Sequence, residues 1–206
     1  MKSVFILILL LLVFSVKAQD ALIVPINADY DGIPPNAYYK DLDNELDGYV
    51  GEWKFSDSSR EFTVVLQKKE MVSLAPLGGY SDFIVGEYRY IENGVQIINT
   101  IPLLASAANE VDNRNIIGSL LFSGPTLYVP CPDCGVNEKR LMLGFFDPQR
   151  PYVTTVSMFL RINPELTEPQ QMTLTIKEMD SYMLPDDTAP LHHRVPYGTY
   201  LMEKQD

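Results

Sequence analysis

The sequence lacks the short motifs that most often mark enzymes. It contains no Gly-x-Ser-x-Gly, no phosphate-binding glycine loop and no His-Glu-x-x-His. Its only histidines are His192 and His193, in a stretch flanked by prolines. No motif supplies them with the positioned partner that a general base needs. We therefore expect no enzyme activity, no catalytic residue and no cofactor, and we interpret the histidines as an exposed pair in a loop.

Basic residues are scarce as well. The chain has 16 Lys and Arg against 27 Asp and Glu, which gives a formal net charge of −11 at pH 7. Such a surface repels phosphate backbones and anionic membrane faces. Because no basic patch interrupts the acidic charge, we expect no nucleic acid as a partner.

Only one long apolar run is present, from Val4 to Val16, and Lys2 precedes it. The residues that follow the run predict a signal peptide over residues 1–18, cleaved after Ala18. The run is shorter than the about 20 apolar residues that span a bilayer, and an uncleaved membrane anchor is the alternative. We expect an exported protein, secreted or periplasmic, that begins at Gln19 and has no stable membrane insertion.

The remaining chain is long enough for one domain and short for two. Residues 19–48 are turn-rich, and we interpret them as a leader that packs on the domain. Asn36 predicts the start of a short helix that reaches Leu46 and ends at Gly48. Residues 49–206 would then form the domain itself.

From residue 49 onward the pattern is that of short strands. Phe62, Val64 and Leu66 alternate with polar neighbours, as in a half-buried strand. Asn93-Gly94 separates two β-branched and aromatic runs, which is a strong hairpin signal. Many strands with turns between them and no recurring helices predict an antiparallel sandwich or barrel. The expected strands are 61–69, 81–91, 95–101, 115–122, 127–129, 140–146, 153–162, 172–177 and 197–202.

The only tryptophan, Trp53, follows Gly51 at the head of the first clear strand. A Gly-x-Trp that opens a run of antiparallel strands suggests a lipocalin-like, up-and-down β-barrel. We therefore expect an all-β fold with a single such barrel and a short N-terminal helix. A glycine inside a strand often marks a close backbone approach, so we assign structural roles to Gly51 and Trp53.

The sequence resembles the opening of a known family in several segments, namely 36–41, 44–47, 49–54, 62–68 and Ile84-Val85-Gly86-Glu87-Tyr88. It is a domain-of-unknown-function family of small exported, lipocalin-like proteins of Bacteroidota. The resemblance covers residues 33–100 and implies fold and export but no activity. In lipocalins an arginine near the last strand packs over the tryptophan ring. Here Arg161 and Arg194 are the candidates for that role.

Cys131-Pro132-Asp133-Cys134 contains both cysteines of the chain. In an exported protein this spacing favours a local disulfide between Cys131 and Cys134 that closes a loop between strands. A redox-active pair would need a helix behind the first cysteine, and the residues that follow look like a strand. A zinc site with His192 and His193 is the third option, although the spacing matches no zinc module.

The acidic residues before Trp53 have a partial calcium-loop spacing. Asp41, Asp43, Glu45 and Glu52 fall at positions one, three, five and twelve, but Leu46 stands where the loop needs glycine. The plainer interpretation is a solvated acidic helix start, which the helix dipole favours. We therefore expect no metal site here.

Three functions remain as hypotheses. The first is a binding module that holds a small apolar ligand in the barrel mouth, and Tyr80, Tyr88 and Tyr90 could line such a cavity. The second is a structural or interaction protein with a filled barrel and no small-molecule ligand. An enzyme is the least expected, and an outer-membrane barrel is a further alternative. The second is favoured by bulky residues in the strands, namely Phe62, Leu66, Met158, Leu160, Met172 and Leu174.

Overall fold

The computed structural model describes residues 21–29, 31–105, 111–124, 129–151, 156–163, 165, 168–179, 188, 190 and 192–205. The predicted signal peptide, residues 1–18, lies outside these residues. The regular structure of the described chain consists of β-strands and three short 3-10 turns. The strands are β1 (Ile23–Pro25), β2 (Tyr38–Lys40), β3 (Gly51–Ser56), β4 (Arg60–Ser73), β5 (Tyr80–Glu92), β6 (Val95–Asn99), β7 (Ile116–Ser123), β8 (Lys139–Phe145), β9 (Val156–Ile162), β10 (Gln171–Glu178) and β11 (Gly198–Lys204). The 3-10 turns are η1 (Asp47–Tyr49), η2 (Ile101–Ala105) and η3 (Val111–Asn113).

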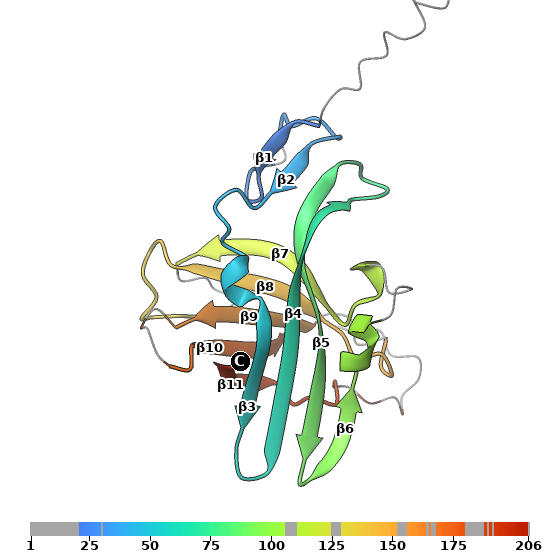
Figure 1. The fold of residues 1–206 in the computed structure, drawn as a ribbon, viewed down its shortest axis with the longest axis vertical. Helices are drawn as coiled ribbons and strands as arrows, with labels where there is room; N and C mark the ends of the chain where they lie inside the picture. Colours follow the sequence, from blue (N-terminus) through green and yellow to red (C-terminus); the bar gives the residue numbers. More distant parts are fainter. Residues whose placement is uncertain are drawn as a thin grey trace, which may run out of the picture.

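Eight of the strands close into an antiparallel barrel. Strands β3, β4, β5, β7, β8, β9, β10 and β11 each pair with the next one, and β11 returns to β3 through Trp53 and Lys204. β5 pairs with β7 through Ile84–Gly86, which joins the two halves. In Figure 1 the strands β7 to β11 cross behind β3, β4 and β5. The predicted all-β, up-and-down barrel is therefore confirmed.

Because side chains alternate between the two faces of a strand, every second side chain points into the barrel. On β4, Phe62, Val64 and Leu66 are buried and belong to the core. The same holds on β9 for Met158 and Leu160, and the remaining strands contribute in the same way. Burial of these apolar side chains is the main stabilising contribution to the fold.

β4 and β5 extend beyond the barrel at one end, where they carry the leader. β2 pairs in parallel with the start of β5, and β1 pairs in parallel with β2. Figure 1 shows β1 and β2 next to the protruding end of the β4–β5 hairpin. The other half of β5 forms a hairpin with β6, and both Asn93 and Gly94 have positive φ there, as their sequence predicts.

The predicted helix from Asn36 to Leu46 is wrong. Tyr38–Lys40 is the strand β2, and only η1 follows it. The strand forms because backbone bonds join Tyr38 N to Leu22 O (2.8 Å) and Tyr80 N to Ala37 O (2.9 Å). Asp41 then accepts bonds from the backbone of Glu45 and Leu46, which holds the chain in turns.

Two further expectations concern single elements. The strand expected at 127–129 falls mostly outside the described residues, and Val129 is not in a strand. In the part of the chain that the structure describes, no helix has the length and apolarity needed to cross a membrane. The remaining expected strands match β4 to β11, with ends that differ by a few residues.

Candidate functional site

Trp53 is at the end of the barrel that η1 covers. Its side chain is 0% exposed, and its Nε1 donates to Tyr49 O at 2.9 Å. The Nζ of Lys204, on the last strand, lies 5.3 Å from the indole ring centroid. Lys204 therefore occupies the position for which Arg161 and Arg194 were the candidates, and the expectation for those two arginines is wrong.

Gly51 makes room for this lysine. Its φ is +131°, a conformation that side-chain-bearing residues rarely adopt, and a Cβ here would lie 3.0 Å from Lys204 Cε. The glycine of Gly-x-Trp and the cation over the tryptophan are thus two parts of one contact.

The acidic residues beside this end bond the backbone and Lys68. The Asp41 carboxylate accepts bonds from Leu46 N (3.0 Å) and Lys68 Nζ (2.8 Å), and Lys68 also bonds Asp47 at 2.7 Å. The calcium-loop residues Asp41, Asp43, Glu45 and Glu52 are not brought together as a ligand set. Among the described residues no group of three or more His, Cys, Asp or Glu could hold a metal ion.

The middle of the barrel is occupied by aromatic rings from strands that are not neighbours in the sheet. Phe62 of β4 lies 5.2 Å from Tyr200 of β11 and 6.4 Å from Phe145 of β8, measured between ring centroids. Phe145 in turn lies 4.7 Å from Tyr88. Burial raises the pKa of Tyr200 to about 12. Tyr88 and Tyr90 are fully buried and pack in this cluster.

At the opposite end an ion pair joins two loops over the core. The Asp147 carboxylate accepts bonds from Arg194 Nη2 (2.6 Å), Arg194 Nε (2.9 Å) and the backbone N–H of both Arg194 and Gln149. Burial alone would raise the pKa of Asp147, but these hydrogen bonds lower it below its ordinary value. Tyr88 donates its hydroxyl to Phe146 O at 2.9 Å, which fixes the same loop.

The two histidines differ in their surroundings. The side chain of His192 is 60% exposed, but His193 is 4% exposed and its ring lies 5.4 Å from that of Phe145. The expectation of two exposed histidines is therefore wrong for His193. His193 packs against the core because the two residues that follow it are held there: Arg194 pairs with Asp147, and Val195 is buried.

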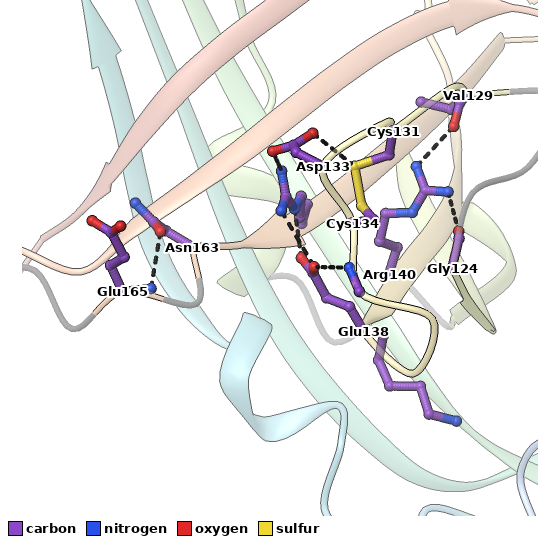
Figure 2. Close-up of polar contacts among 12 residues, drawn as sticks. Gly124, Val129, Cys131, Asp133, Cys134, Glu138, Arg140, Asn163 and Glu165 are labelled. Atoms are coloured by element: carbon purple, nitrogen blue, oxygen red, sulfur yellow. Dashed lines mark hydrogen bonds and ion pairs between the residues drawn. A yellow bond between two sulfur atoms is a disulfide. The ribbon is translucent and has the colours of Figure 1, made fainter.

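The disulfide expected between Cys131 and Cys134 is present, and the Cys134 N–H also bonds Cys131 O at 3.2 Å. The turn belongs to the segment that joins β7 to β8 and lies on the outer face of the barrel. Figure 2 shows this segment with Asp133, Glu138 and Arg140 around it. Neither a redox-active dithiol nor a zinc site is indicated, because both sulfur atoms are in the bond and no helix follows.

Two outward-facing arginines hold this loop in different ways. Arg161 of β9 bonds Glu138 through Nε (2.5 Å) and Asp133 through Nη1 (2.8 Å). Arg140 of β8 donates only to backbone carbonyls, those of Val129 (2.9 Å) and Gly124 (2.6 Å), as Figure 2 shows. Its guanidinium also lies 4.6 Å from the ring centroid of Phe122.

A hollow of about 210 Å³ lies between this loop and the barrel wall, and we name it the outer hollow. The loop side consists of residues 129–133, and the barrel side of Arg140, Phe159, Leu160, Arg161, Thr173, Thr175 and Thr199. A second hollow, of about 350 Å³, lies beside β6 and Arg194. Sequence patterns missed both, because their walls combine residues far apart along the chain.

The family model described as "Family of unknown function (DUF6705)" matches residues 1–205, and the chain belongs to this family. The match agrees with the expected membership of a family of unknown function and covers nearly the whole chain. No curated protein and no solved structure matches.

Proposed function

We propose that this protein is an exported binding protein whose lipocalin-like barrel is a filled scaffold and whose partner contacts its outer surface. One observation carries the proposal: aromatic rings from strands that are not neighbours in the sheet meet inside the barrel. Phe62 lies near Tyr200 and Phe145, and all three side chains are buried. Rings in contact leave no room between them for a ligand of drug size, whose sites usually measure about 300–1,000 Å³.

Two observations support export. The first 18 residues have the composition of a signal peptide. The only two cysteines are bonded to each other, and disulfides persist mainly in oxidising compartments. Secretion and a periplasmic location are both compatible with these observations.

The competing function is binding of a small apolar ligand in the barrel mouth. It has less support, because the mouth end is covered by the Asp147–Arg194 ion pair and the adjacent residues. His193 and Val195 of that segment are buried against the core. A ligand could enter only if this segment moved away.

Native mass spectrometry of the exported, purified protein tests the two functions. We expect the mass of the polypeptide alone and no saturable uptake of a neutral apolar dye such as N-phenyl-1-naphthylamine. Phe62→Leu serves as a control, because it removes ring volume from the middle of the barrel and opens a small apolar space. A stoichiometric small molecule released on denaturation, or tight dye binding by the unmodified protein, would contradict the filled barrel.

A further inference from the structure

Arg140 is a buried cation whose contacts differ from those of the neighbouring Arg161. Its side chain lies on the outer face of β8, yet the residue is only 2% exposed because the disulfide-bonded loop covers it. Among the described residues it forms no ion pair, and its Nε has no hydrogen-bond partner. A buried charge is unfavourable unless it is paired and fully hydrogen-bonded.

The neighbouring arginine differs in this respect. Arg161 is matched by two carboxylates, Asp133 and Glu138, and their hydrogen bonds raise its pKa. For Arg140 the direction is reversed, since burial and the positive charge of Arg161 lower its pKa more than the nearby Glu138 raises it. The two carbonyls and the Phe122 ring stabilise the guanidinium in part, but they carry no negative charge.

Arg140 lines the outer hollow, and hydroxyl groups line the same space. Thr173 and Thr175 of β10 and Thr199 of β11 face outward there, and Thr175 Oγ1 lies 3.1 Å from Thr199 Oγ1. Threonine hydroxyls donate to oxyanions, and guanidinium groups bind them with charge-assisted hydrogen bonds. The hollow is therefore lined by two arginines, the Asp133 carboxylate and three threonine hydroxyls, one of which already donates its proton in the Thr175–Thr199 bond.

We propose that the outer hollow binds an oxyanion, that is a carboxylate, sulfate or phosphate group, through Arg140 with the help of the threonines. The anion bonds the guanidinium of Arg140, whose Nε has no hydrogen-bond partner among the described residues. Arg140 and Arg161 together balance the two negative charges of Asp133 and Glu138, so the hollow has no net charge that would repel the anion. The inference rests on the proposed function only in locating binding outside the barrel, and the dye and mass measurements test that location separately.

Amide NMR titration of the oxidised protein tests the proposal. Sodium acetate, sodium sulfate and sodium phosphate are added separately, with sodium chloride holding the ionic strength constant. We expect saturable shifts at Cys131, Asp133, Thr173 and Thr175 with at least one oxyanion and none with chloride. A response to acetate alone identifies a carboxylate ligand, and a response to sulfate or phosphate identifies a tetrahedral one.

Substitutions then assign the contact. Arg140→Gln should raise the Kd by about tenfold or more, the value of one charge-assisted hydrogen bond. Arg60→Gln is the matched control, because Arg60 pairs with Asp57 near the opposite end of the barrel, and it should leave the Kd unchanged. If Arg140→Gln fails to fold, the Thr173→Val and Thr175→Val double variant, which keeps every charge, should still weaken binding.

Three results would overturn the proposal. One is the lack of saturable shifts with all three oxyanions, which would leave Arg140 as a residue that only fixes the loop. Another is an unchanged Kd in Arg140→Gln and in the threonine variant. The third is a set of shifts confined to residues outside the hollow.

Discussion

The surroundings of Trp53 and those of the Cys131–Cys134 loop are held by different interactions. Trp53 is fully buried and belongs to a core cluster formed by all eight barrel strands. The loop lies outside the barrel and is fixed by a disulfide, by the Arg161 ion pairs and by two bonds from Arg140 to carbonyls. Stability should therefore depend on the first region far more than on the second, which leaves the loop open to a binding role.

The largest effect should come from Trp53→Ala. Truncating a buried tryptophan removes about 3–5 kcal/mol, which is a large part of the about 5–15 kcal/mol that stabilises a domain. Chemical denaturation measures the change. Since Trp53 is the only tryptophan, native fluorescence should be blue-shifted and move to the red on unfolding. Red-shifted native emission would mean that the ring is in water and that the two regions do not differ as described.

The Asp147–Arg194 pair tests whether a polar contact can matter as much as the apolar core. Asp147→Asn should destabilise the protein by about 3 kcal/mol, because it leaves the Arg194 charge partly buried and unmatched. The exposed pair offers a control: Asp57→Asn removes the partner of Arg60 and should change stability far less than Asp147→Asn does.

Lowering the pH should destabilise the protein through the Asp147 carboxyl. The folded pKa of Asp147 is lowered below its unfolded value of about 3.9. Its stabilising contribution is therefore complete above the unfolded pKa and is lost as the pH falls through the folded one. Urea melts between pH 6 and pH 2 should show a weaker pH dependence in Asp147→Asn than in the unmodified protein. Equal dependence in both proteins would assign acid sensitivity to other groups.

Gly51→Ala should have a smaller effect than Trp53→Ala in the same region. A non-glycine residue in this backbone conformation is strained by about 1–3 kcal/mol, and the new methyl group would push Lys204 away from the indole ring. Gly48→Ala is the matched control, since a Cβ there meets only Ile162 at 4.0 Å. Equal losses from both substitutions would show that the close approach at Gly51 is unimportant.

The strands and turns of the barrel could be predicted from the sequence, and there is a physical reason for this. Phe62, Val64 and Leu66 and the Asn93-Gly94 turn identify strands and a hairpin, because strand periodicity and turn conformation are local properties. The barrel followed from these local signals. The helix at residue 36 was predicted wrongly because a tertiary contact, the pairing of β2 with β5, outweighed the local capping signal.

The sites depended on contacts that no local pattern encodes. Lys204 reaches Trp53 from 151 positions along the chain only because β11 closes against β3. Arg140 gave no sequence signal, since a single arginine in a strand is usually exposed. His193 is buried although it lies in a loop, and the burial of loop residues does not follow from hydrophobic periodicity.

The smallest effect should come from removing the disulfide. By the chain-entropy argument a loop as short as Cys131–Cys134 restricts the unfolded chain little, so Cys131→Ser with Cys134→Ser should lower stability by at most about 1–2 kcal/mol. Arg161 and Arg140 would still hold the loop through Glu138, Asp133 and two carbonyls. Thermal denaturation of the double variant, compared with reduced unmodified protein, measures the loss. A collapse comparable to that of Trp53→Ala would show that the loop belongs to the stabilising core after all, and the contrast between the two regions would fail.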